Sequence, residues 1–163
     1  MKAELQKKLV EKYPKFFQYL DENETPMIDP SEPIMDNVQK LYNQEKIVLP
    51  MQFGFECGDG WYWLIDQLMD TIYSYCRDNN KEVPHVIQIK EKFGGLRFYI
   101  NGGNELIDGM IWLAEHMSYS ICERCGTTNS VGQTEGWVYT ICETCKENDS
   151  RAKDMNYRKR KEK

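Results

Sequence analysis

The sequence predicts an α+β fold, in which helices pack on a short antiparallel β-hairpin and a small metal-binding knuckle follows at the C-terminal end. Two segments repeat apolar residues with the period of an α-helix. Between them, an alternating segment with two adjacent glycines is typical of a hairpin. Two Cys-x-x-Cys pairs follow. We expect an α+β body over residues 1–119 and a metal-binding module with a basic C-terminal helix or tail over 120–163.

Size and composition indicate a globular chain. Its 163 residues suit one domain or a domain with a small appendage, and its 40% apolar and 29% charged residues are typical of globular proteins. No apolar run approaches the roughly 20 residues that span a bilayer. The first residues lack the apolar region of a signal peptide. We therefore expect a soluble cytoplasmic protein with no membrane partner.

Charge is distributed unevenly along the chain. The net charge is −5, but the last 13 residues hold seven Lys/Arg and two Asp/Glu, so they carry +5 and the first 150 residues carry −10. An acidic body argues against a protein that coats nucleic acid. The basic tail either contacts phosphates or is a solvated helix end, and the favourable interaction of cations with a helix C-terminus supports the second interpretation.

The N-terminal third is predicted to hold helical and extended segments. A helix over residues 2–20 should break near Tyr13, because Pro14 interrupts it. An acidic, proline-rich loop over 21–33, a short helix over 34–44 and an extended segment over 46–56 should follow.

The clearest helix begins at Trp61. Apolar residues recur at helical spacing for more than four turns, and Asp59 stands where an N-cap belongs. The periodic residues are Trp61, Leu64, Ile65, Leu68, Met69, Ile72, Tyr73 and Cys76.

The segment from His85 to Gly102 is predicted to form a hairpin with a two-residue turn at Gly94-Gly95. This turn pairs Phe93 with Leu96, Glu91 with Phe98 and Ile89 with Ile100 on a mostly apolar face. Lys90, Lys92, Arg97 and Tyr99 then share the other face. A second amphipathic helix is expected over 104–119, with an apolar stripe formed by Leu106, Ile107, Met110, Ile111, Ala114 and Met117.

The cysteine region has the spacing Cys-x2-Cys-x16-Cys-x2-Cys, from Cys122, Cys125, Cys142 and Cys145. Two such turns aim four thiolates at one point, which is the pattern of structural zinc sites. Two disulfides or a redox pair are the alternatives, and an intracellular chain without a thioredoxin-like context disfavours both. Four sulfur ligands close the coordination sphere, so we expect no catalysis by the metal.

The residues around the second pair set the type of knuckle. A strand within 134–141 should return to Cys142 and Cys145, which should begin a helix that runs into the basic tail. This order is closer to a treble clef than to an all-β zinc ribbon.

Two further stretches are candidate ligand sites. In "GFECGDGW", Glu56 and Asp59 flank Cys57 before a helix N-terminus, where a binding loop or a simple capped turn is expected. A nucleophilic role for Cys57 is an alternative that the sequence does not favour, since no histidine partner is evident. On the hairpin, Lys90, Lys92, Arg97 and Tyr99 form either a phosphate-binding patch or a solvated face. Glu91 is the one carboxylate on the apolar face.

These motifs in this order resemble a family of uncharacterised bacteriophage and prophage proteins. The resemblance rests on "GFECGDGW", "KEKFGGLRFY" and "AEHMSYSICERCG" with a second cysteine pair, over about residues 50–145. It implies an accessory protein that acts in a host cell, and it assigns no catalytic residue. We therefore expect a non-enzymatic module that binds a host protein or a nucleotide. The alternatives are nucleic-acid binding through the zinc finger and basic tail, and a metal-dependent nuclease that uses Glu56, Asp59 and Glu91.

Overall fold

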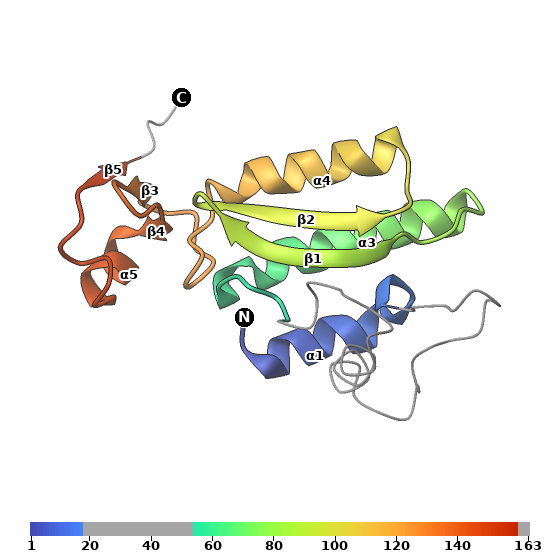
Figure 1. Ribbon diagram of the computed structural model, residues 1–163, viewed down its shortest axis with the longest axis horizontal. Helices are drawn as coiled ribbons and strands as arrows, with labels where there is room; N and C mark the ends of the chain where they lie inside the picture. The colour runs from blue at the N-terminus through green and yellow to red at the C-terminus, as the bar shows by residue number, and fades with distance from the viewer. Residues whose placement is uncertain (18–53, 160–163) are drawn as a thin grey trace, which may run out of the picture.

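The computed structural model describes residues 1–17 and 54–159, which form a body and a smaller C-terminal module (Figure 1). The body holds helices and a hairpin: α1 (Ala3–Lys12), α3 (Tyr62–Asp78), β1 (His85–Lys92), β2 (Gly95–Asn101) and α4 (Glu105–Ser118). The module holds β3 (Val131–Thr134), β4 (Thr140–Cys142), α5 (Glu143–Asn148) and β5 (Tyr157–Lys159). The predicted mixture of helices with antiparallel sheet is confirmed, whereas the elements predicted between residues 21 and 53 lie outside the described residues.

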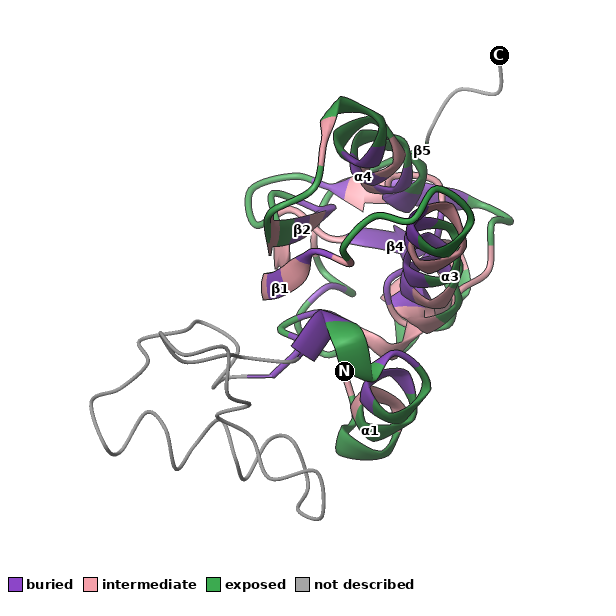
Figure 2. Cartoon of the chain, turned by 90° about the vertical axis from the view of Figure 1, so that its right-hand side faces the viewer, coloured by how far each residue is buried: buried purple, intermediate pink, exposed green. Residues whose placement is uncertain are grey.

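The three helices that the structure describes in the body surround the inner side of the hairpin. Figure 2 shows α4 above, α3 beside and α1 below the two strands, with the buried residues turned toward the centre. Trp61, Phe16, Phe17 and Phe55 are the largest side chains in this core. No described helix has the length and apolar character needed to cross a membrane.

The N-terminal helix breaks where Pro14 predicts. The last residue of α1 is Lys12, and Tyr13 leaves the helical conformation with φ −128° and ψ 57°. Pro14 then starts a short 3-10 helix, Pro14–Phe17, because a proline disfavours helical geometry in the residue before it. Lys12 and the Tyr13 hydroxyl both contact the Asp66 carboxylate of α3, at 2.8 and 3.0 Å, and so fix α1 against α3.

Helix α3 has the predicted buried stripe, but its start differs from the prediction. Asp59 does not cap α3; it opens a 3-10 turn, Asp59–Trp61. Its carboxylate accepts a hydrogen bond from the Lys2 backbone N–H at 2.7 Å and pairs with the Lys2 ammonium at 3.3 Å. The predicted N-cap is therefore wrong, because the N-terminal segment supplies both a donor and a charge that bind the carboxylate.

The hairpin forms, but its register is shifted by two residues from the predicted one. Lys92 pairs with Gly95 and Ile89 with Phe98, so the turn residues are Phe93 and Gly94, at φ +53° and +75°. Side chains alternate with a period of two, so a shift of two keeps the predicted faces of the strand residues. The predicted place of Phe93 on the apolar face is wrong, because Phe93 lies in the turn and is 73% exposed. A bulge lies between Val86 and Gln88.

Both edges of the hairpin make hydrogen bonds to other segments. Along β2, the backbone N–H groups of Leu96 and Phe98 donate to Ser118 Oγ and the Glu115 carboxylate of α4, at 2.9 and 3.0 Å. Along β1, Glu56 forms a parallel bridge: its N–H donates to Ile89 O and its carbonyl accepts from Glu91 N–H, both at 2.9 Å. The hairpin thus remains a two-stranded sheet, and this isolated bridge covers the β1 edge only beside Glu56.

Helix α4 buries a narrower stripe than predicted. Ile107, Ile111 and Ala114 are buried as expected. Leu106 and Met117, assigned to the same stripe, are exposed at 53% and 39%. The helix carries apolar residues on two faces, so periodicity alone did not identify the buried one.

The module is a three-stranded antiparallel sheet, in the order β4-β3-β5, with the short helix α5. The predicted basic C-terminal helix is wrong: α5 ends at Asn148, and Tyr157–Lys159 returns as the edge strand β5. Gly132 of β3 permits this pairing, because a Cβ there would come within 2.9 Å of Lys159 Cα. The predicted strand before Cys142 is present only from Thr140.

Candidate metal centre and the adjoining cleft

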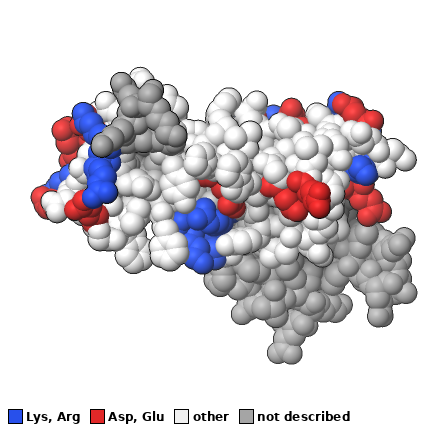
Figure 3. Space-filling model, turned by 90° about the horizontal axis from the view of Figure 1, so that it is seen from above, with Lys and Arg blue, Asp and Glu red and all other residues white. Residues whose placement is uncertain are grey.

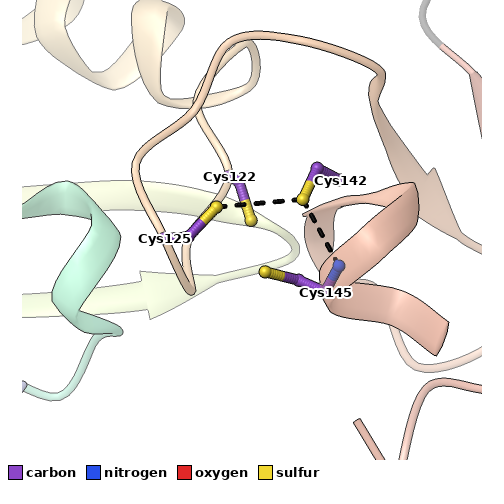
Figure 4. A group of neighbouring side chains, drawn as sticks. All are labelled: Cys122, Cys125, Cys142 and Cys145. Atoms are coloured by element: carbon purple, nitrogen blue, oxygen red, sulfur yellow. Dashed lines mark hydrogen bonds between the residues drawn. The ribbon is translucent and has the colours of Figure 1, made fainter. Parts of the chain in front are cut away.

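Four cysteine sulfurs converge in the module. Cys122 and Cys125 lie on the turn after α4, Cys142 ends β4, and Cys145 lies in the first turn of α5. Figure 4 shows the four side chains directed at a common centre. All four Sγ atoms lie within 4.8 Å of one another, and each cysteine is a free thiol. The predicted convergence of the two pairs is confirmed.

The local backbone holds each pair in place. In the first pair, Gly126 N–H donates to Cys122 O at 2.8 Å, and Gly126 adopts φ +79°, a conformation that favours glycine. In the second pair, Cys142 is the N-cap residue of α5, and its sulfur accepts from the Cys145 N–H at 3.4 Å. Both pairs are thus fixed by the fold of the backbone.

The geometry fits a single tetrahedral ion. A tetrahedron with metal–sulfur bonds of about 2.3 Å has edges of about 3.8 Å, and the distance from Cys125 Sγ to Cys142 Sγ is 3.8 Å. Burial raises the pKa of the Cys122 thiol, although backbone N–H groups that donate to its sulfur oppose the shift. A cation at the centre would compensate the charge of four neighbouring thiolates.

The "GFECGDGW" loop packs directly on this cysteine turn. Gly60 N–H donates to Glu123 O at 2.9 Å, and Gly58 N–H donates to a Glu123 carboxylate oxygen at 2.8 Å. A Cβ on Gly60 would overlap the Cys122 carbonyl oxygen and lie 2.5 Å from Gly126 N. The two glycine-containing motifs therefore form one joint between the body and the module.

A cleft of about 620 Å³ opens beside this joint. Its walls come from both parts of the chain, and they bring together Glu56, Asp59 and Glu91, the three carboxylates singled out in the sequence. A fourth carboxylate in the cleft wall is Glu123, which lies between Cys122 and Cys125 in the sequence. Within the described residues, only the four cysteines are close enough to hold a metal ion as a group of three or more, so these carboxylates do not form a metal site there.

The basic side chains of the cleft already have acidic partners, whereas the Met1 ammonium donates to the backbone carbonyls of Phe55 and Cys57. Arg124 and Arg151 both pair with Asp149, at 3.1 and 3.6 Å, and both lie over the Tyr139 ring. Lys2 pairs with Asp59. Beside them, Trp137 is 66% exposed.

Three carboxylates of the cleft have no ion pair among the described residues. Glu56 accepts from the Gln88 amide at 2.8 Å and Glu91 from the Gly94 N–H at 2.6 Å. Glu123 is 6% exposed, and burial raises the pKa of its carboxyl, although the Gly58 N–H opposes the shift. Arg124 and the N-terminal ammonium also act on the Glu123 carboxylate, so the negative charge that the cleft presents without an ion pair is that of Glu56 and Glu91.

Sequence reasoning missed Glu123, Arg124, Trp137, Tyr139 and Arg151 as cleft residues. They come from three separate stretches, and no local pattern in the sequence marks them.

The cationic hairpin face is separate from the cleft. Arg97 reaches α4, where its guanidinium donates to the Tyr119 hydroxyl at 3.2 Å and lies 3.8 Å from the Glu115 carboxylate. Lys90 is half-buried over the Tyr99 ring, at 5.7 Å, and Lys92 is exposed. None of these four lines the cleft with Glu56 and Asp59.

The remaining cysteines are ordinary core residues. Cys57 is 6% exposed, and burial raises the pKa of its thiol to about 12. A thiol with so high a pKa holds almost no thiolate at neutral pH, which argues against a nucleophilic role. Cys76 is fully buried on the α3 stripe, as its position predicts.

Comparison of the chain with protein-family models, curated proteins and solved structures found no match. The resemblance to bacteriophage proteins thus stays a prediction.

Proposed function

We propose that the chain is a non-enzymatic binding module, stabilised by one structural Zn²⁺, whose ligand site is the cleft between the body and the metal-binding module. The observation that carries this proposal is the cleft itself, because both parts of the chain contribute its walls and two of its carboxylates, Glu56 and Glu91, form no ion pair among the described residues. The ligand that fits is a basic segment of another protein, and in the phage context that the sequence resemblance implies, this is a host protein.

Zinc is the metal that this ligand set favours. Four cysteine sulfurs at tetrahedral spacing are typical of structural zinc, and they leave no open position for water or substrate. The order of a cysteine turn, the β3–β4 hairpin and a helix that begins at the second pair supports a treble clef over an all-β ribbon.

The cleft favours a protein ligand over a nucleotide. A phosphate group would face Glu56, Glu91 and Glu123, while the neighbouring arginines are held by Asp149. A lysine or arginine side chain would gain charge-assisted hydrogen bonds from the same carboxylates and contact with the exposed Trp137 ring.

The tail gives less support to nucleic-acid binding. Arg158 pairs with Glu135 at 3.3 Å and Lys159 with Glu143 at 2.7 Å. These two described cations of the tail therefore already have carboxylate partners, although both ion pairs are exposed to solvent.

Zinc content is tested by native mass spectrometry of the purified full chain. We expect one zinc per chain, lost in Cys122→Ser and kept in Cys57→Ala, which removes a cysteine outside the cluster. Zinc retained by Cys122→Ser would refute the site.

Ligand binding is tested by fluorescence anisotropy with a labelled oligoarginine peptide. We expect salt-sensitive binding that falls several-fold in the double variant Glu56→Gln/Glu91→Gln. The matched control is Glu147→Gln/Asp154→Asn, which removes equal charge outside the cleft. Equal binding by both double variants, or tighter binding of single-stranded DNA or oligoglutamate than of oligoarginine, would contradict the proposal.

A further inference from the structure

Helix α4 turns a second apolar face away from the core. Four large side chains on it are exposed, although the helix already buries another stripe: Leu106 at 53%, Trp112 at 67%, Leu113 at 53% and Met117 at 39%. Figure 3 looks down on this side of the molecule, where groups of Asp/Glu and Lys/Arg interrupt a surface of other residues. A helix that is apolar on both sides is typical of one buried on both sides.

Gly109 lies at the middle of this exposed face. No atom lies within 4 Å of a Cβ built on it, so packing in the described chain does not require a glycine there. Glycine in a helix interior costs about 1 kcal/mol relative to alanine. The missing side chain leaves a notch one helical turn from Trp112, the most exposed large residue of α4.

We propose that this face of α4 pairs with the same face of a second copy of the chain, with the two helices antiparallel. A two-fold axis between residues 110 and 111 relates position 109 of one copy to position 112 of the other. Each Trp112 ring then enters the notch at Gly109 of the other copy. The ring is already ordered for this, because it stacks on His116 with centroids 5.5 Å apart and planes at 10°.

The charges at the ends of the face select a second copy over another apolar partner. The same axis relates position 105 to position 116. Glu105 begins the helix and His116 lies in its last turn. An antiparallel pair therefore places an acid beside a basic group at both ends, whereas a parallel pair places like groups together.

The exposed area predicts a weak dimer. With roughly 200 Å² for a fully exposed large side chain, the four residues offer about 420 Å² per copy, so the pair buries about 850 Å² of apolar surface. When the polar residues around these four side chains are included, the total buried area comes near the lower limit of about 1,200 Å² for specific interfaces. The dimer should thus dissociate on dilution.

Sedimentation equilibrium of the zinc-loaded full chain, from low micromolar to several hundred micromolar, tests the pairing. We expect a concentration-dependent dimer. Gly109→Gln fills the notch with a residue that favours helix and should weaken association at least tenfold. Its melting temperature, measured at the lowest concentration, shows that the monomer is folded.

The charge pair tests the register. Glu105→Lys places a cation opposite His116 and should weaken association several-fold, and the double variant Glu105→Lys/His116→Glu should restore it. A monomer at every concentration, a dimer that Gly109→Gln leaves intact, or a double variant that stays as weak as Glu105→Lys would each overturn the proposal.

Discussion

Substitution of Gly60 by alanine tests the joint between the body and the cysteine module. A Cβ at this position would overlap the Cys122 carbonyl oxygen and lie 2.5 Å from Gly126 N. These are backbone atoms of the metal-binding turn, so no flexible side chain can move aside. Overpacking of this kind costs about 1–3 kcal/mol. A shift of the turn also strains the 2.9 Å hydrogen bond from the half-buried Gly60 N–H to Glu123 O, and its loss would cost up to about 1–3 kcal/mol more.

The expected loss for Gly60→Ala is therefore about 3 kcal/mol, which lowers the Tm of a chain of this size by roughly 6–12 °C. Thermal unfolding of the zinc-loaded protein, followed by circular dichroism, measures it. Gly109→Ala, compared at a concentration at which the chain is a monomer, is the matched control: in the single chain it makes the same chemical change in open space, and helix propensity predicts a gain of up to about 1 kcal/mol. If Gly60→Ala melts within a degree or so of the unmodified protein, the two motifs are not packed as described.

Three further predictions concern the body. Asn104→Ala removes the N-cap of α4, whose side chain accepts hydrogen bonds from the Leu106 and Ile107 N–H groups at 3.1 and 3.2 Å. Urea unfolding should show that the free energy of unfolding falls by about 1 kcal/mol. In the control Asn104→Asp, which keeps a capping oxygen, the free energy of unfolding should fall much less. Glu115→Ala leaves the Phe98 backbone N–H without its acceptor and should lower the free energy of unfolding by about 1–3 kcal/mol in the same assay. Glu115→Gln keeps an acceptor, so an equal loss in this variant would contradict the role given to the hydrogen bond. Burial, with the hydrogen bond to Asp66, raises the pKa of Tyr13 from 10.0 to about 12. The folded protein therefore favours the protonated hydroxyl. This contribution to the free energy of unfolding is fully present below pH 10 and is lost as the pH rises toward 12. The alkaline fall in Tm should accordingly be shallower in Tyr13→Phe, and an unchanged slope would argue against Tyr13 as its source.

Local signals predicted the elements that depend on local sequence. The buried stripe of α3 and the cysteine cluster could be predicted, because the spacing of these residues along the chain itself places their side chains on one side of a helix or of a turn. The sequence predicted that a hairpin forms, but it did not predict which two residues make the turn. Gly94 is the turn glycine, at φ +75°. Gly95 is needed for another reason: a Cβ there would overlap the Tyr119 ring of a segment 24 residues later. The sequence shows two adjacent glycines and not their separate roles.

Where the structure departs from the prediction, distant parts of the chain decide the outcome. Lys2 takes the carboxylate of Asp59 away from the helix start. Gly132 admits a strand where basic residues had indicated a helix. The cleft gathers residues from 1 to 151, so no pattern along the chain identifies it. Propensity and spacing describe neighbours in sequence, whereas each of these features is a contact between distant segments.

The joint also links the two chemical features of the chain. Glu123 lies between the cysteines of the first pair, and it accepts hydrogen bonds from both Gly58 and Gly60 of the body. Through this residue, the turn that positions Cys122 and Cys125 also positions the wall of the cleft. A structural metal, in the proposed function, thus acts on ligand binding without contacting the ligand: its loss would free the turn, and the carboxylates of the two parts would no longer face one cleft.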